Sequence, residues 1–184
     1  QFENHLRAVL GLPLGDTRAL GAACMLNWVG AMPDAKAVLG EAGGHWHDYG
    51  KEPRAGRKVG HATLRADDPQ AVRLQAASAL QREAQAEQLP LLTRRLAQEK
   101  DPQVRDALSI ALANLQLADA SPQVRFNAVR LLGESGEPET RARLQVLTDA
   151  ANEPDAAVRA EAQRSLQRVQ HRLMIGDLLG QAFS

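Results

Sequence analysis

A repeated helix-start signal constrains the fold of this chain more than any other feature. In four places an acidic or hydroxyl residue stands before Pro, and an Arg follows that Pro within a few residues. The four segments are Asp68–Arg73, Asp101–Arg105, Ser121–Arg125 and Glu153–Arg159. A side chain before Pro can accept hydrogen bonds from free backbone N–H groups, and Pro fits the first turn of a helix. The pattern therefore predicts four helices that begin alike.

Spacing within and between these segments predicts their packing. Seven residues after each arginine stands a leucine: Leu80, Leu112, Leu132 and Leu166. Partner helices are expected over Gln88–Gln98 and Glu139–Ala150. The arginines are 32, 20 and 34 residues apart, so in the short middle interval the turn Gln116–Ala120 is expected in place of a partner helix. We expect about six helices in a short right-handed solenoid, each repeat burying its apolar face against the next.

The arginines of the repeats allow two interpretations. Arg73, Arg105, Arg125 and Arg159 are expected to pair with acidic residues at the starts of neighbouring repeats. Alternatively, they line a groove that binds a peptide or partner helix. A second set is interleaved with acids and Gln, which favours a solvated helix face over an anion-binding groove. That set is Arg141, Arg143, Arg164, Arg168 and Arg172.

Composition divides the 184 residues into two parts. Ten of the 14 glycines, four of the five histidines and both tryptophans lie in residues 1–66, whereas residues 67–184 hold six of the nine prolines. Such a shift predicts two domains of different architecture that meet near Ala66–Asp68. The expected fold class is α+β: a helix and β-hairpins in residues 1–66, then an all-α repeat domain in residues 67–184.

Charge and cysteine content exclude several classes of protein. The 22 basic and 22 acidic residues cancel, which removes the case for a general nucleic-acid binder. The single cysteine, Cys24, excludes an internal disulfide framework and a multi-cysteine metal site, and we interpret it as a small buried side chain rather than a nucleophile. No apolar run of 18 residues occurs, so no membrane span is expected.

The first part is expected to form a helix over Gln1–Leu10 and strands over Met25–Val29, His45–Tyr49 and Val59–Leu64, with one or two helical turns over Pro33–Leu39. A His-x-His pair, His45 and His47 followed by Asp48, suggests a metal site. However, only His61 or His5 is available as a further ligand. Packing and hydrogen bonding are the preferred interpretation, and we expect no metal and no cofactor.

A turn between the last two strands carries four basic residues, Lys51, Arg54, Arg57 and Lys58. Arg grips phosphate in a bidentate manner and Lys acts as a point charge, so this turn can bind an anion. A solvated hairpin tip explains the same residues equally well.

Several segments of residues 1–66 carry a family resemblance: Gln1–Ala8, Gly11–Gly15, Met25–Asn27, Asp48–Lys51 and Arg54–His61. They are similar to the C-terminal part of 5-(carboxyamino)imidazole ribonucleotide synthase (PurK), an ATP-grasp enzyme of purine biosynthesis. The resemblance implies that Lys51 and Arg57 contact the ribonucleotide. It also implies no catalysis by this chain alone, since that family's ATP and magnesium sites precede the segment matched here. Ala55 stands where that family has Pro.

Residues 68–184 resemble HEAT-like repeats. Arg130–Gly136 and Arg172–Ser184 are in addition similar to the N-terminal extension of the urea ABC-transporter permease of the UrtB type, which precedes its first membrane span. The transport pathway itself is not part of that extension. The resemblance implies at most a docking or folding module for such a permease.

Three functions compete on these grounds. The preferred one is a fusion, natural or engineered, of two unrelated proteins with no evolved joint function, in which the repeats are at most a protein-binding scaffold. The others are a ribonucleotide-binding remnant of the synthase and a docking module of the permease. The two parents belong to different compartments, so localisation stays open; the chain is expected to stay in the cytoplasm if expressed as it stands, since no signal peptide is seen.

Overall fold

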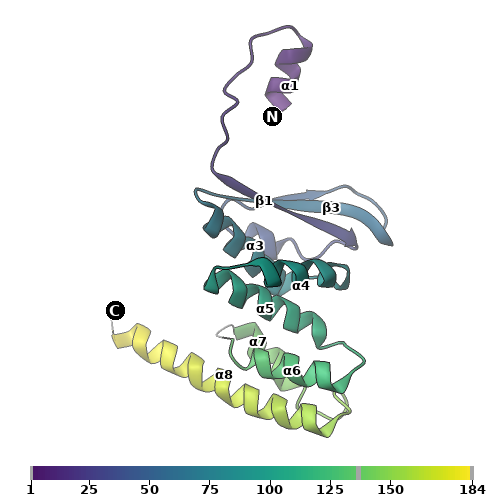
Figure 1. The fold of residues 1–184 in the computed structure, drawn as a ribbon, viewed down its shortest axis with the longest axis vertical. Helices are drawn as coiled ribbons and strands as arrows, with labels where there is room; N and C mark the ends of the chain where they lie inside the picture. The colour runs from purple at the N-terminus through teal and green to yellow at the C-terminus, as the bar shows by residue number, and fades with distance from the viewer. Residues whose placement is uncertain (1, 136–137, 183–184) are drawn as a thin grey trace.

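A computed structural model describes residues 2–135 and 138–182, which form a small sheet followed by a row of helices (Figure 1). The elements are α1 (Phe2–Val9), β1 (Ala22–Gly30), α2 (Lys36–Leu39), β2 (His45–Asp48), β3 (Arg54–Ala66), α3 (Pro69–Glu83), the 3-10 turn η1 (Ala86–Gln88), α4 (Leu89–Gln98), α5 (Pro102–Gln116), α6 (Pro122–Leu132), α7 (Pro138–Val146) and α8 (Ala156–Ala182). The expected α+β class is confirmed. Gln1, Gly136, Phe183 and Ser184, which belong to the motifs quoted above, lie outside the described residues.

The sheet has three antiparallel strands in the order β1-β3-β2, so β1 and β2 are its edges. All three predicted strands are present, and Pro33–Leu39 yields the single short helix α2. Alternate side chains of β1 and β3, among them Leu26, Trp28 and Leu64, are buried in a core that they share with α3. Figure 1 shows α3 on one face of the sheet. Burial of these apolar residues on one face fixes the register of the strands.

Capping explains where two of the repeat helices begin and corrects the prediction for the others. Asp68 accepts hydrogen bonds from the backbone N–H groups of Gln70 (2.7 Å) and Ala71 (3.0 Å), as expected. Asp101 likewise accepts one from Val104 (3.0 Å). Ser121 makes no side-chain cap bond. At the fourth start, Asp155 caps α8 in place of Glu153, because the helix begins two residues after Pro154.

The expected partner helices are present as α4 and α7, although α7 ends at Val146, short of the predicted Ala150. No helix separates α5 from α6, which confirms the expected turn in the short interval. The alanines at the helix crossings are buried: Ala76, Ala107, Ala128 and Ala162. Small side chains let the helix backbones approach closely, so α3, α5, α6 and α8 pack in succession.

The buried residues form two cores. The sheet core joins residues of β1 and β3, such as Trp28 and Leu64, to residues of α3, α4 and α5, such as Leu92. The helical core joins α5, α6, α7 and α8 around Leu132 and Leu144. The sheet core crosses the composition boundary at Ala66–Asp68, so the sheet and the first repeat share one apolar interior.

Helix α1 stands apart from both cores. None of its residues is buried, and Figure 1 shows it beyond the sheet, on the side away from the repeat helices. Within residues 2–135 and 138–182, no helix is long and apolar enough to cross a membrane.

Candidate functional site

The basic turn begins where β2 ends. Tyr49 donates its backbone N–H to the carbonyl of Val59 (3.0 Å), which extends the β2–β3 pairing by one residue. The carboxylate of Asp48 then accepts from the N–H of Gly50 (2.8 Å), and Gly50 has a positive φ of 62°. This conformation suits glycine and reverses the chain directly after Tyr49.

Two lysines of the turn gather on the Tyr49 ring. The Nζ atoms of Lys51 and Lys58 lie 5.0 Å and 5.8 Å from the ring centroid, within the range of a cation–π contact. The Tyr49 hydroxyl lies 2.8 Å from Nδ1 of His61, and the His61 ring stacks on His47 at 4.4 Å between centroids. We call these five residues the tyrosine cluster.

A β-bulge places Lys58 in this cluster. In the pairing of β1 with β3, Trp28 faces Gly60 but Val29 faces Lys58, so Val59 is an extra residue. Such a bulge shifts the alternation of side chains along the strand. Val59 is therefore buried, and Lys58 lies on the same exposed face as His61.

The resemblance implies that Lys51 and Arg57 both contact a ribonucleotide, but the bulge places these two residues in different surroundings. Arg57 precedes Lys58 and is half-buried, and its guanidinium donates to the carbonyl of Glu52 (3.4 Å). Arg54 is exposed at the start of β3. The structure thus brings Lys51 and Lys58 together on Tyr49 and places neither arginine in that cluster.

The cluster combines positive charge with aromatic rings. Burial, together with electrostatic repulsion from His47 and Lys58, lowers the pKa of His61, which favours its neutral form. A neutral His61 can accept a hydrogen bond from the Tyr49 hydroxyl. Two ammonium groups beside stacked rings suit a ligand with an anionic group and a planar ring.

Sequence reasoning missed Tyr49 and His61 as members of this site. A signal was available, because residues 47 and 49 share one face of a strand and residue 61 pairs opposite residue 47. One histidine of the suggested metal site makes a ring contact instead. His47 stacks on His61, and among the described residues no group of three His, Cys, Asp or Glu side chains could hold a metal ion. Cys24 is half-buried, and burial raises the pKa of its thiol.

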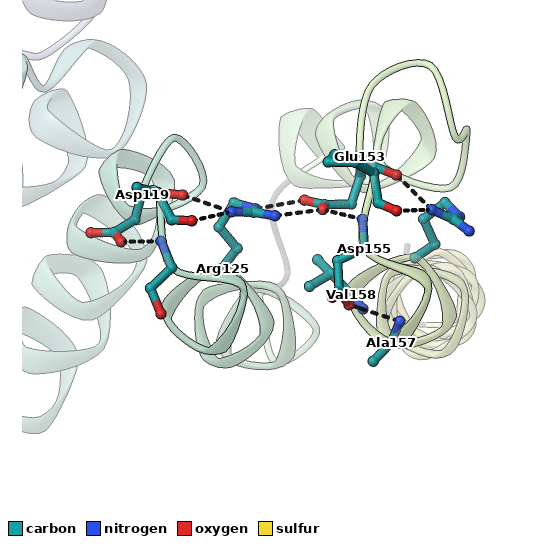
Figure 2. Close-up of polar contacts among 10 residues, drawn as sticks. Asp119, Arg125, Glu153, Asp155, Ala157 and Val158 are labelled. Carbon is teal, nitrogen blue, oxygen red and sulfur yellow. Dashed lines mark hydrogen bonds and ion pairs between the residues drawn. The ribbon is translucent and has the colours of Figure 1, made fainter.

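The repeat arginines form two series of hydrogen bonds and ion pairs that connect successive helix starts. We call each series a ladder. Figure 2 shows the longer one: Arg125 donates to Glu153 Oε1 and Oε2 (2.7 and 2.8 Å) and to the carbonyl of Asp119 (2.9 Å). Arg159 donates to the carbonyls of Glu153 (2.8 Å) and Pro154 (2.7 Å). The carboxylate and carbonyls hold the turn before α8 against the start of α6.

The first ladder repeats this scheme with fewer bonds. Arg73 pairs with Glu99 (3.0 Å), and Arg105 donates to the carbonyls of Leu96 (3.0 Å) and Glu99 (2.8 Å). The expected pairing with acids is therefore found for Arg73 and Arg125, whereas Arg105 and Arg159 bind backbone carbonyls. Each pair of arginines serves the turn between two repeats.

Three of the five arginines of the second set, all on α8, pair with neighbouring carboxylates, whereas Arg143 donates to the carbonyl of Arg82 (3.4 Å). Arg164 and Arg168 both pair with the buried Glu161, at 2.7 and 2.8 Å. Arg172 pairs with Glu134 at 2.9 Å, which ties α8 to the end of α6. These pairs leave little positive charge for an anion on α8.

A groove of about 620 Å³ crosses the helices α3, α5, α6 and α8. Apolar side chains on it include Leu74, Ile110 and Leu131, and polar ones include Asp106 and Arg172. We call it the repeat groove. Arg73, Arg105, Arg125 and Arg159 do not line it.

Comparisons with known proteins divide the chain in two. Residues 23–75 match the phosphoribosylaminoimidazole carboxylase C-terminal domain, and residues 111–179 match HEAT repeats. The expected resemblances of the first part to the synthase and of the second to HEAT-like repeats are confirmed. The likeness to a urea permease stays a prediction.

Individual relatives cover the first part alone. An N5-carboxyaminoimidazole ribonucleotide synthase of Pseudomonas aeruginosa is 59% identical over 68 residues, which are 37% of this chain and 19% of that protein. The same enzyme of Vibrio parahaemolyticus is 51% identical over 69 residues, 38% and 18% of the two chains. A crystal structure of the corresponding synthetase from Thermus thermophilus is 49% identical with a TM-score of 0.42, and covers 46% of this chain and 23% of that one. This chain thus spans about a fifth of the length of the curated relatives it matches.

Proposed function

We propose that this chain is a binding protein without catalytic activity of its own, and that the repeat groove holds a segment of a protein partner. The observation that carries the proposal is the groove itself, which four helices line and which crosses from the sheet core to the helical core. Stacked helical repeats typically present extended binding surfaces of this kind.

The lining of the repeat groove suggests the chemistry of the partner. Leu74, Ile110 and Leu131 offer an apolar strip to a helix or an extended segment. Arg172 is already paired with Glu134, whereas Asp106 forms no ion pair within the described residues. A basic side chain beside the apolar anchors of the partner would complement Asp106.

Affinity capture with matched variants tests this proposal. Leu131 is exposed in the groove, so Leu131→Glu changes the surface without opening a core. Arg130→Glu, on the next residue of the same helix and outside the groove, is the control. We expect a protein from the source cells that binds the wild type and the control and is lost with Leu131→Glu. A set of captured proteins that is identical for all three would contradict the proposal.

A second candidate function rests on the two lysines held over Tyr49. We infer that the tyrosine cluster binds a phosphorylated ribonucleotide, with the phosphate on Lys51 and Lys58 and the planar base against the histidine stack. Support comes from the name of the relatives, N5-carboxyaminoimidazole ribonucleotide synthase. Without further residues of a pocket, the affinity is expected to be weak.

Calorimetric titration with 5-aminoimidazole ribonucleotide tests the second candidate. The double variant Lys51→Ala/Lys58→Ala is expected to weaken binding at least about tenfold, since two phosphate contacts are lost. Lys36→Ala removes an exposed lysine on α2 and is the control. Arg57→Ala distinguishes two predictions. The resemblance predicts that this change weakens ribonucleotide binding strongly, whereas the geometry of the tyrosine cluster predicts little effect on binding. No heat of binding to the wild type would rule out this function.

We also propose that the two parts of the chain come from unrelated proteins that were joined. The two family matches do not overlap, which supports a fusion of unrelated proteins, natural or engineered, rather than one inherited domain. Sequencing of the source DNA across the codons for residues 55–80 tests it, since separate loci for the two halves would identify a recombined chain. The docking role at a urea permease is tested by co-purification with such a permease.

A further inference from the structure

The outer edge of β1 presents backbone groups that no other strand binds. Strand β1 lies at one side of the sheet, and within the described residues only β3 pairs with it. In an antiparallel pair, every second residue directs both its N–H and its C=O toward the partner strand, and the residues between direct theirs away. Which residues of β1 face outward therefore decides what this edge can bind.

Two hydrogen bonds identify the outward-facing residues. The side-chain amide of Gln88 donates to the carbonyl of Asn27 (3.3 Å), so that carbonyl faces away from β3. Arg65, which stands opposite Ala23, donates its N–H to a carbonyl on the β2 side of the sheet (3.2 Å), so its N–H is turned away from β1. By the same alternation, Ala23 and Met25 direct two N–H donors and two C=O acceptors outward.

A groove of about 500 Å³ follows this edge and is closed by α3 and α4. All six residues Ala22–Asn27 line it, whichever face of the sheet their side chains occupy, so the groove runs along the backbone edge itself. Its other walls are largely apolar and include Leu80, Leu91 and Leu92. We call it the edge groove. Its volume lies in the range of sites that enclose several side chains.

Helix α4 runs along the edge groove antiparallel to β1. Gln88, directly before α4, bonds to Asn27, and the last turns of α4 lie beside earlier residues of the strand: burial raises the pKa of the Cys24 thiol, and the charge of Arg95 opposes this rise. Four residues of a helix advance about 6 Å, and two residues of a strand about 6.6 Å. Leu91 and Arg95 therefore stand two strand residues apart along the groove.

Arg95 is a charge in the groove without a counter-charge. Arg73 and Glu99, which also line the groove, pair with each other at 3.0 Å, whereas Arg95 forms no ion pair within residues 2–135 and 138–182. An exposed guanidinium beside apolar side chains favours an occupant that carries a carboxylate. The free backbone groups of Ala23 and Met25 in addition favour an occupant with amides of its own, which a purely apolar ligand lacks.

We propose that the edge groove binds an extended peptide of a partner protein, which joins the sheet as a fourth strand beside β1. The peptide is short, about five residues, because Gln88 closes one end of the edge. Two spacer residues of the peptide pair with the backbone of Ala23 and Met25. Between them an acidic side chain points to Arg95, and two residues away an apolar side chain packs on Leu91.

In this binding mode the main-chain hydrogen bonds give affinity, and the alternate side chains that enter pockets give specificity. The proposal involves neither the repeat groove nor the tyrosine cluster, so it stands independently of the functions proposed above.

Selection from a phage-displayed library of random octapeptides on the full chain tests the proposal. We expect enriched sequences in which Asp or Glu stands two positions from an apolar residue. Leu91 and Arg95 are exposed, so Leu91→Glu and Arg95→Glu open no core. In fluorescence anisotropy, each is expected to weaken binding of a selected peptide at least about tenfold, because the new carboxylate repels the acidic side chain. Arg94→Glu makes the same charge change outside the groove and should bind as the wild type does.

Methylation of single peptide amides distinguishes strand addition from insertion of apolar side chains alone. A methyl group on a spacer amide removes a donor that faces β1 and should abolish binding, whereas one on the amide of the acidic residue should be tolerated. In hydrogen exchange, the amides of Ala23 and Met25 should become protected when the peptide binds. The proposal would be overturned by a library that yields no enriched peptide, by equal binding to Arg95→Glu, or by a selected peptide that tolerates methylation at every position.

Discussion

The two cores meet on opposite faces of α5 and differ in how they are built. The sheet core joins a sheet to three helices through large side chains such as Trp28, Leu64 and Leu92. The helical core joins only helices and is closed by the ladder around Arg125 and Glu153. The tyrosine cluster lies on the other, exposed face of the same sheet.

The two regions therefore differ in role: the region near the sheet holds the candidate site, whereas the charged groups near α8 stabilise the fold. Near the sheet, polar groups and grooves remain open to solvent, as in the cluster on Tyr49. Near α8, the charged groups satisfy one another: Arg125 and Glu153 are only 12% and 2% exposed, against 43% and 13% for Arg73 and Glu99. The same sequence motif therefore forms a buried structural pair in one repeat and a surface pair in another.

The largest expected effect tests whether the sheet and the first repeat unfold together. Trp28→Ala removes a fully buried ring from the sheet core and should lower the free energy of unfolding by about 4 kcal/mol. Leu132→Ala is the matched change in the helical core. Hydrogen exchange should show loss of protection over β1, β3, α3 and α4 in the first variant, and over α6–α8 in the second. Loss confined to the strands in Trp28→Ala would contradict a shared core.

A smaller effect should distinguish the two ladders. Glu153→Ala leaves Arg125 buried without its carboxylate and should cost about 3 kcal/mol in the free energy of unfolding. Glu99→Ala leaves Arg73 in contact with water and should cost about 1 kcal/mol. Urea denaturation of both variants measures the difference. Equal losses in the free energy of unfolding would show that the greater burial of the Arg125–Glu153 pair does not increase its contribution to stability.

The smallest effect is a dependence on pH. The Arg125 guanidinium holds the pKa of Glu153 below its usual value, and the pKa of Glu99 is lowered chiefly by the N–H of Asp101. A carboxyl with a depressed folded-state pKa stabilises the fold above its unfolded-state pKa of about 4.3, and this contribution is lost as the pH falls through the folded-state value. The urea midpoint should drop between pH 6 and pH 3, and less so in Glu153→Gln. Parallel curves for the two proteins would refute the assignment to Glu153.

Much of the repeat architecture could be predicted from spacing. Pro at each helix start and leucine seven residues after each arginine follow directly from helix geometry, and six helices α3–α8 are found in the described residues. The exact caps could not be predicted, because a carboxylate on either side of Pro154 can reach free N–H groups. Which one does so depends on Glu153 being engaged by Arg125.

The candidate site was predicted less well. The sequence identified a basic turn. However, closeness in sequence does not show which of its four basic residues share one site. The bulge at Val59 decided that Lys58 joins Lys51 on Tyr49 while Arg57 does not. A bulge depends on how apolar side chains of two strands fit a common core, and no local pattern of residues records that fit.

By itself, the sequence determined the elements, the composition boundary and the two resemblances, because periodicity, capping and turn residues act over a few positions. Only the tertiary structure decided that one core crosses the boundary and that α5 serves both cores. Those features arise from contacts between residues far apart in sequence, where burial of apolar surface rather than local preference selects the partner.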